Sequence, residues 1–182
     1  MERNLIVAGF GGQGVMMLGT LLAQATCDST DKHVTYFPSY GAAMRGGTAN
    51  CYVVISDDEI GAPVMDAVED LIVMNEPSLH KFLPKLKEGG ILFVNSSIVT
   101  SDPGRDDVTL VKVPVTQMAI DMGNPKVLNI IMLGAYIGAT EVVPKEVIIE
   151  TIKNKLGKKK PEFLPMNLEA FEKGYAIGAA AK

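Results

Sequence analysis

The sequence of 182 residues predicts an α/β fold, a three-layer sandwich in which helices cover both faces of a mostly parallel sheet. Short apolar runs alternate with helical segments along most of the chain, which is typical of strands and crossover helices in such a fold. A content of 47% hydrophobic against 21% charged residues supplies enough apolar side chains for a sizeable core. Because no linker or internal repeat interrupts this pattern, we expect a single domain over residues 1–182.

The first half of the chain contains the clearest strand signals. The short apolar run at 5–8 is typical of a strand that is buried on both faces, and the run at 33–37 is rich in β-branched and aromatic residues. Pro38 is expected to end the second strand, and Glu69 and Asp70 are expected to form a turn before the fourth. The predicted elements are strands at 5–8, 33–37, 49–56 and 71–74, with a helix at 15–25 after the first strand.

The second half is mostly helical. Gly89 and Gly90 are expected to stop its first helix, Pro144 suits a first helical position, and Asn167 is a candidate cap of the last helix. Small residues between 127 and 139 allow close helix packing, within the chain or across an interface. The predicted elements are helices at 78–87, 116–122, 127–140 and 144–156, a last helix from 167 through 176 or beyond, and strands at 91–95 and 108–113.

Charge and targeting signals exclude several classes of protein. The formal net charge is −4, whereas nucleic-acid binders more often carry clustered basic residues on one face. The basic run from Lys158 to Lys160 is interpreted as a solvated turn. The N-terminus lacks the basic and apolar regions of a signal peptide. The long uncharged stretch near the N-terminus is not a membrane span, because the glycines between residues 9 and 14 interrupt it. We therefore expect a cytoplasmic protein that binds neither nucleic acid nor membranes.

Residues that usually carry catalysis are scarce. The chain has two histidines, His33 and His80, and two cysteines, Cys27 and Cys51, without a Cys-x-x-Cys pair. Zinc and iron–sulfur sites need closely spaced ligands of these types, and both cysteines are interpreted as small buried hydrophobes. We therefore expect no catalytic residue and no metal ligand in this chain.

A glycine-rich loop joins the first strand to the first helix. Its spacing, Gly9-x-Gly11-x-x-Gly14, matches the dinucleotide-binding fingerprint of Rossmann-like folds. The backbone N–H groups of such a loop and the positive end of the following helix attract anions. Gly11, Gly12, Gln13 and Gly14 are therefore candidate binding residues for a cofactor or substrate.

One part of the dinucleotide fingerprint is missing. An NAD site also needs an acidic residue at the end of the second strand to hold the ribose, whereas the segment from Tyr36 to Ser39 contains none. A free-standing Rossmann-like oxidoreductase that binds NAD or FAD is therefore kept as a disfavoured alternative. Gln13 has two interpretations, since its amide either bonds a ligand or holds the adjacent loop in place.

A second glycine-rich loop places one cation in an otherwise uncharged stretch. Arg45 is the only Lys, Arg, Asp or Glu between residues 33 and 56, and its guanidinium suits carboxylate or phosphate groups. An ordinary solvated arginine is the alternative. Loops at the carboxyl ends of strands bind ligands in open α/β sheets, and we expect both glycine loops at that edge. The candidate binding residues of this loop are Tyr40, Gly41, Arg45, Gly46 and Gly47.

Taken together, the two loops resemble a known family. The segments at 9–15, 39–41 and 45–48, followed by a strand that ends at 55–56, look like the gamma subunit, or gamma domain, of 2-oxoacid:ferredoxin oxidoreductases of the pyruvate, ketoisovalerate and 2-oxoglutarate type. The resemblance extends over nearly the whole chain, including the helix that contains residues 129–134. One departure is Ala42 and Ala43, where many members carry Pro-Glu or a similar polar pair.

The resemblance implies a role within a complex. In this family the holoenzyme oxidatively decarboxylates a 2-oxoacid to acyl-coenzyme A and reduces ferredoxin. Thiamine pyrophosphate is held by the alpha and beta subunits, and iron–sulfur clusters by beta or by a small delta subunit. The gamma subunit packs on these partners and shapes the coenzyme A end of the site, so the isolated chain is expected to bind no cofactor and to be inactive. The small subunit of the related indolepyruvate enzyme is an alternative within the same resemblance.

Overall fold

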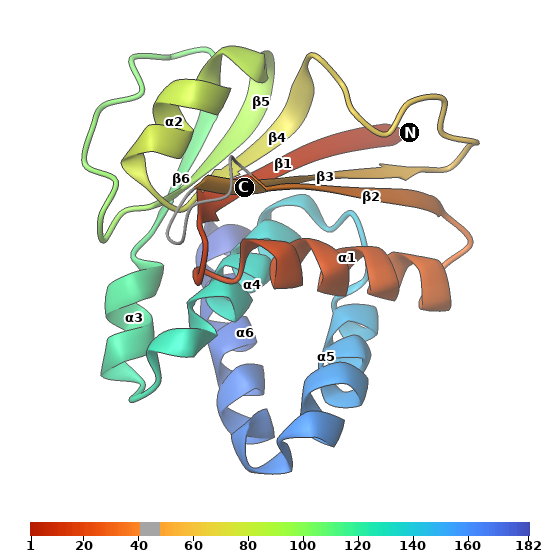
Figure 1. Ribbon diagram of the computed structural model, residues 1–182, viewed down its shortest axis with the longest axis vertical. Coiled ribbons are helices and arrows are strands. Elements are labelled where there is room, and N and C mark those ends of the chain that lie inside the picture. The colour runs from red at the N-terminus through yellow and green to blue at the C-terminus, as the bar shows by residue number, and fades with distance from the viewer. Residues whose placement is uncertain (41–47) are drawn as a thin grey trace.

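The computed structural model describes residues 1–40 and 48–182, which form a six-stranded sheet with helices on both of its faces (Figure 1). The strand order across this sheet is β2-β3-β1-β4-β5-β6. The strands are β1 (Glu2–Phe10), β2 (His33–Tyr40), β3 (Thr48–Ser56), β4 (Val68–Val73), β5 (Leu86–Asn95) and β6 (Thr109–Val113).

The strand directions confirm the prediction of a mostly parallel sheet. The neighbours β1, β4, β5 and β6 pair in parallel, whereas β3 runs antiparallel to both of its neighbours, β1 and β2. Within the described residues β3 is therefore the one reversed strand, and β2 runs in the same direction as β1. The carboxyl ends of these five co-directional strands consequently lie at the same edge of the sheet.

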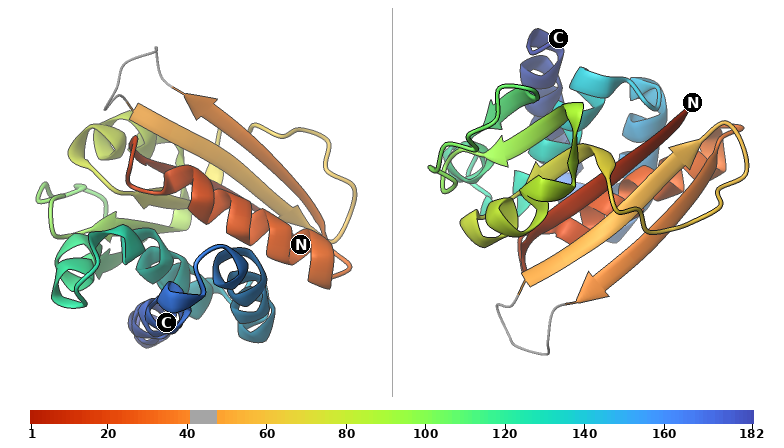
Figure 2. Two further views of the ribbon diagram at one scale, coloured as in Figure 1. Left: turned by 60° about the horizontal axis from the view of Figure 1, so that its bottom comes forward. Right: turned by 90° about the horizontal axis from the view of Figure 1, so that it is seen from above.

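Helices cover the two faces unequally. Four long helices lie on one side of the sheet and α2 lies on the other, which confirms the predicted sandwich (Figures 1 and 2). The helices are α1 (Val15–Ser29), α2 (Glu76–Phe82), α3 (Val115–Asp121), α4 (Leu128–Thr140), α5 (Lys145–Lys159) and α6 (Leu164–Ala180), and the short 3-10 turns are η1 (Leu83–Lys85), η2 (Pro125–Val127) and η3 (Pro161–Phe163). None of the helices in the described part of the chain combines the length and hydropathy that a bilayer crossing requires.

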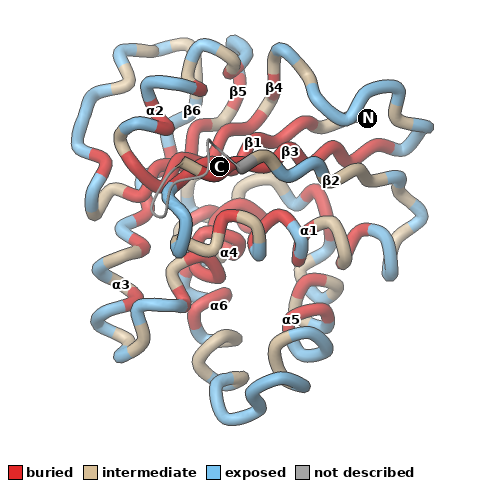
Figure 3. The backbone as a smooth tube through the Cα atoms, viewed as in Figure 1, coloured by how far each residue is buried: buried red, intermediate tan, exposed pale blue. Residues whose placement is uncertain are grey.

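Strand β1 shows why both faces need a cover. Leu5 and Val7 pack into the core formed with α1 and α4, whereas Ile6 and Ala8 pack into the core formed with α2. Side chains alternate between the faces of a strand, and all four residues are buried, so β1 is apolar on both sides. Figure 3 shows the resulting buried band through the middle of the sheet.

Helices α4 and α6 pack through glycines on both sides. Gly134 and Gly138 of α4 face α6, and Gly174 and Gly178 of α6 face α4. A Cβ at any of the four would overlap a backbone carbonyl oxygen of the opposite helix. The prediction that small residues in the first of these helices allow close packing is confirmed, and the partner is a helix with glycines at the same spacing of four.

A buried carboxylate connects β1, β4 and α4. Asp70 is fully buried and accepts hydrogen bonds from Nε and Nη2 of Arg3, at 2.5 and 2.7 Å, and from the Tyr136 hydroxyl at 2.9 Å. The expectation of a turn at Glu69 and Asp70 is wrong, because both residues lie within β4, where Asp70 pairs with Leu5. A bidentate guanidinium and a hydroxyl together compensate the desolvation of this carboxylate within the strand.

Two predicted element ends are wrong for identifiable reasons. Strand β2 continues through Pro38 to Tyr40, because an edge strand tolerates a residue without an N–H donor. Gly89 and Gly90 lie inside β5, and α2 already ends at Phe82. Gly89 has φ 80°, and the register between β4 and β5 is irregular nearby, so these glycines mark a distortion of a strand and not a helix stop.

Further corrections concern the ends of α5 and α6 and one cysteine. Asn167 lies inside α6, which begins three residues earlier with a proline in its first turn. The basic run is not a separate turn, because Lys158 and Lys159 form the end of α5. Cys51 is buried as expected, whereas Cys27 is exposed on the last turns of α1. Helix α1 extends four residues further than its apolar pattern, and this extension carries Cys27 beyond the core.

Candidate functional site

At the carboxyl edge of the sheet, two adjacent strands lead into helices that lie on opposite faces. Strand β1 leads through residues 11–14 into α1, and β4 leads through Met74 and Asn75 into α2. Helix α1 packs on one face and α2 on the other (Figure 1). In open α/β sheets ligands bind in the crevice at such a point. The first glycine loop therefore occupies the place where this fold is best suited to bind a ligand.

The backbone of this loop is shaped for an anion. Gly12 and Gly14 have φ values of 91° and 72°, which side chains other than glycine rarely adopt. Gly14 is the N-cap of α1, no side chain caps this helix, and its first turn contains no acidic residue. The first N–H groups of α1 thus keep their capacity to donate to an anion. Gly11 and Gly12 are exposed, so a ligand has access to the loop.

Gln13 ties the loop to the neighbouring strands. Its Oε1 accepts a hydrogen bond from the Phe10 N–H at 2.7 Å, and its Nε2 donates to the Met74 carbonyl at 3.1 Å. Asn95, at the end of β5, donates to the same carbonyl at 3.3 Å and to Thr116 Oγ1 at 2.9 Å. Side-chain amides thus join the carboxyl ends of β1, β4 and β5. These contacts agree with the interpretation that the Gln13 amide holds the adjacent loop in place.

Asn129 belongs to this site, and the sequence analysis missed its role. The residue is buried in the first turn of α4, and its Nδ2 donates to the Gly14 carbonyl at 3.3 Å. Its side chain also fills the space that a Cβ at Gly14 would need. The two residues are 115 positions apart, so no local spacing could connect them. The one available signal was a polar amide within an otherwise apolar helix start.

Strand β3 brings the flanks of the second glycine loop to the same edge. Thr48, at the start of β3, pairs with Phe10 at the end of β1. Tyr40, at the end of β2, pairs with Ala49. Both flanks therefore lie beside the first glycine loop, as expected for the edge of the sheet. The remaining predicted residues, Gly41, Arg45, Gly46 and Gly47, lie outside the described residues.

The described residues bear on two kinds of chemical site, metal centres and reactive thiols. Among them, no group of three or more His, Cys, Asp or Glu side chains is placed to hold a metal ion. Burial raises the pKa of the Cys51 thiol to about 12, so it stays protonated at neutral pH and is no nucleophile. Iron–sulfur clusters need several thiolates, and one buried and one exposed cysteine do not fit such a cluster.

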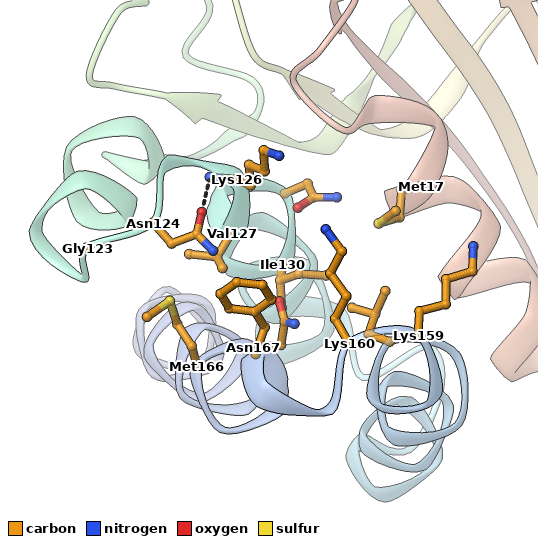
Figure 4. A pocket seen from close by; sticks show the side chains of 13 residues that line it. Met17, Gly123, Asn124, Lys126, Val127, Ile130, Lys159, Lys160, Met166 and Asn167 are labelled. Carbon is orange, nitrogen blue, oxygen red and sulfur yellow. Dashed lines mark hydrogen bonds between the residues drawn. The ribbon is translucent and has the colours of Figure 1, made fainter.

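A cavity lies next to this edge, on the face of the sheet that α1 and α4 cover. A cavity of about 560 Å³ opens between α1, the turn that precedes α4, and the junction of α5 with α6 (Figure 4). Asn129, which contacts Gly14, also lines this cavity. The glycine loop and the cavity are therefore neighbouring parts of one surface.

Comparison with known proteins gives a consistent family. A family model described as pyruvate ferredoxin/flavodoxin oxidoreductase matches residues 4–177. Among curated relatives, the ketoisovalerate oxidoreductase subunit VorA of Methanothermobacter thermautotrophicus is 37% identical over 175 residues. This match covers 95% of the present chain and 36% of VorA.

Two solved structures resemble the chain along its length. The gamma subunit of a keto/oxoacid ferredoxin oxidoreductase from Geobacter sulfurreducens matches with a TM-score of 0.87 and 30% identity, covering 100% of this chain and 99% of that one. A 2-oxoglutarate:ferredoxin oxidoreductase from Magnetococcus marinus, with 2-oxoglutarate, coenzyme A and succinyl-CoA bound, matches with a TM-score of 0.90 and 26% identity. The chain covers 31% of that longer protein, and 98% of the chain is matched. The chain thus spans about a third of the two longer relatives, VorA and the Magnetococcus enzyme, and nearly all of the Geobacter subunit. It belongs to the pyruvate ferredoxin/flavodoxin oxidoreductase family.

Proposed function

We propose that the chain is the gamma subunit of a multi-subunit 2-oxoacid:ferredoxin oxidoreductase, which converts a 2-oxoacid to acyl-coenzyme A and passes electrons to ferredoxin. The observation that carries this proposal is the match to a solved gamma subunit over 99% of its length, with a TM-score of 0.87. The first glycine loop and the two flanks of the second lie at the carboxyl edge of the sheet, where the fold is suited to bind a ligand.

In this proposal the reaction centre lies in partner subunits. Thiamine pyrophosphate and iron–sulfur clusters are assigned to alpha and beta subunits and to a delta subunit where one is present, and ferredoxin contacts the assembled enzyme. The scarcity of thiolates and of clustered acids among the described residues supports this division. The matched region is about a third of VorA and of the Magnetococcus enzyme, so in those proteins it is part of a longer chain. We place the assembly in the cytoplasm.

The contribution of this chain is to shape the coenzyme A end of the site. Coenzyme A carries phosphate groups, and α1 offers uncapped N–H groups at Gly14 beside the exposed Gly11 and Gly12. Arg45, in a loop whose flanks lie at the same edge, adds a guanidinium suited to phosphate. Tyr40, Gly41, Gly46 and Gly47 complete the proposed contact set. The Magnetococcus structure holds coenzyme A, which supports this choice of ligand.

Affinity purification from the native cell tests the assembly. A tagged copy of this chain should recover larger subunits together with bound thiamine pyrophosphate and the visible absorption of iron–sulfur clusters. An untagged culture provides the control for adhering proteins. Recovery of the chain by itself, without thiamine- or cluster-containing proteins, would contradict the proposal.

A further inference from the structure

The edge strand β2 leaves one face of the sheet without a helix over it. Val34 and Tyr36 pack against the core formed with α1, and side chains alternate between the two faces of a strand. Thr35, Phe37 and Ser39 therefore point to the other face. The right panel of Figure 2 views that face, and no helix among the described residues lies over β2 there. These side chains thus lack a helical cover within the described part of the chain.

Two phenylalanines are exposed on this uncovered face. Phe37 is 45% exposed and pairs with Tyr52 of β3, which packs into the core on the α2 side. Phe10, the last residue of β1, is 37% exposed. It lies on the same face, because Ala8, two residues earlier, also packs into the core on the α2 side. We define the β2 face as Phe10, Thr35, Phe37, Ser39 and Thr48, the last of which pairs with Phe10.

The β2 face carries no charged side chain. None of the residues of β2 and β3 is Lys, Arg, Asp or Glu, and Lys85 of η1, which borders the face, donates from its Nζ to the Tyr52 hydroxyl at 3.3 Å. A solvated face of antiparallel strands normally presents polar residues, and exposed edge strands are commonly protected by charges. Exposed aromatic residues without charges are instead typical of the core of a protein–protein interface. The composition therefore indicates a protein partner.

The backbone of β2 indicates how such a partner binds. As the edge strand, β2 has no neighbour on its outer side among the described residues. Pro38 lacks the N–H group that a further strand would need for a regular ladder along the whole of β2. The arrangement therefore favours a folded surface that packs on the side chains over a strand added to the sheet.

The position of the β2 face selects the partner. Phe10 leads directly into the first glycine loop, and Tyr40 and Thr48 flank the second. Under the proposed function these loops meet a reaction centre that another subunit holds, which agrees with the scarcity of thiolates and of clustered acids among the described residues. That subunit has to approach the carboxyl edge of the sheet, and the β2 face is continuous with this edge.

We propose that the β2 face is the docking surface for the subunit that holds thiamine pyrophosphate, and that this subunit presents an uncharged, largely apolar surface to it. The rings of Phe10 and Phe37 anchor the contact, since aromatic side chains are enriched at the centre of protein interfaces. The assignment rests on the proposed function, and it names the surface through which the chain joins the assembly.

Affinity purification of tagged full-length variants from the native cell tests this surface. Phe37→Glu places a carboxylate in the apolar contact, so the thiamine pyrophosphate recovered with the tagged chain should fall at least about tenfold. Phe37→Leu keeps the face apolar and should retain most of the recovery. Leu110→Glu is the matched control, because Leu110 is 37% exposed on β6, the opposite edge strand, and it should leave the recovery unchanged.

Two further measurements on the purified full chain complete the test. Circular dichroism reports whether each variant is folded, and Ser39→Lys, which adds a charge to the face and keeps both rings, takes the place of Phe37→Glu if that variant unfolds. Light scattering reports self-association. A wild-type dimer that Phe37→Glu converts to a monomer would assign the face to a second copy of this chain and overturn the proposed partner.

The outcomes separate this inference from the proposed function. Loss of thiamine pyrophosphate from folded Phe37→Glu, with Leu110→Glu and Phe37→Leu unaffected, supports the β2 face as the docking surface. Undiminished recovery with both Phe37→Glu and Ser39→Lys overturns it, while the wild-type recovery still supports the proposed function. A wild-type chain that recovers no thiamine-containing protein contradicts the proposed function itself, and the assignment of the face to that subunit falls with it.

Discussion

The side chain of Asn129 covers the Cα of Gly14 and donates from its Nδ2 to the Gly14 carbonyl at 3.3 Å. This contact joins the first turn of α4 to the N-cap of α1, so the starts of the two helices hold each other in place. The glycine loop is thereby positioned by a residue far along the chain. Its shape depends on Gly14 for two reasons, a φ of 72° and the absence of a Cβ.

Gly14→Ala should therefore destabilise the protein by about 2–5 kcal/mol, the sum of a left-handed backbone penalty and of overpacking against Asn129. Urea unfolding measures this change. Gly61→Ala is the matched control, because no atom lies within 4 Å of a Cβ there. Equal effects of the two substitutions would show that the Asn129 contact does not constrain the loop.

Gly174→Ala tests the close packing of α4 and α6. The new methyl group would overlap the carbonyl oxygen of Ile131, so the helices must separate at a cost of about 1–3 kcal/mol or more. Gly157→Ala is the control, because its Cβ would meet only the flexible side chain of Leu164, at 3.0 Å. That substitution should be neutral or should stabilise by up to about 1 kcal/mol through helix propensity. A neutral Gly174→Ala would contradict the described helix contact.

Asp70→Asn removes the charge that Arg3 and Tyr136 share. The guanidinium is then left partly buried without its counter-ion, and we expect a loss of about 3 kcal/mol in the free energy of unfolding. Lys173→Ala, which breaks an exposed pair with Glu169, is the control and should cost about 0.5 kcal/mol or less. Equal losses in the free energy of unfolding for Asp70→Asn and Lys173→Ala would contradict the role of Asp70 in connecting β1, β4 and α4.

Glu76 gives the fold a defined sensitivity to acid. Hydrogen bonds from the backbone N–H groups of Ser101 and Thr100, at 2.9 and 2.6 Å, lower its pKa from 4.5 to about 2. The carboxylate therefore stabilises the folded state fully above about pH 4.5, and this contribution is lost as the pH falls toward 2.

The variant Glu76→Gln should accordingly be less stable than the wild type at pH 7, and the difference should narrow as the pH falls from 4.5. Unfolding measured in urea over this range gives the comparison. Glu59→Gln, at an exposed position, should change stability by less than about 0.5 kcal/mol at pH 7. A difference between wild type and Glu76→Gln that stayed constant with pH would contradict the role of the carboxylate.

Arg45→Ala tests the proposed contact with coenzyme A. In the assembled enzyme KM for coenzyme A should rise about tenfold with little change in kcat, as expected for the loss of one charged contact made equally in the ground and transition states. Arg45→Lys keeps the charge and should restore part of the affinity. An unchanged KM in Arg45→Ala would remove this residue from the site.

The sequence was most informative where one local pattern determines one element. Alternating apolar runs and helices predicted the sandwich, and the glycine spacing before residue 15 predicted the strand-loop-helix unit that the structure contains. The ligand roles of both glycine loops and the single domain over 1–182 stay predictions. The glycine loop is held by Gln13 and Asn129, and only the first of these lay within reach of a local motif.

The errors arose where distant partners change what a residue can tolerate. Asp70 lies in a strand because Arg3 and Tyr136 compensate its charge. Pro38 stays in a strand because β2 is an edge, and Gly89 lies in a distorted part of β5, which pairs with both β4 and β6. None of these partners is adjacent in the sequence, so propensity alone pointed to a turn, a strand end and a helix stop.

Ferredoxin reduction by the complex purified through a tag on this chain tests the central claim most directly. The rate with a 2-oxoacid should depend on added coenzyme A, and acyl-coenzyme A should form in proportion to the ferredoxin reduced. A panel of pyruvate, 2-oxoglutarate and branched-chain 2-oxoacids would also identify the substrate. A purified complex that reduces no ferredoxin with any of these acids and coenzyme A would contradict the account.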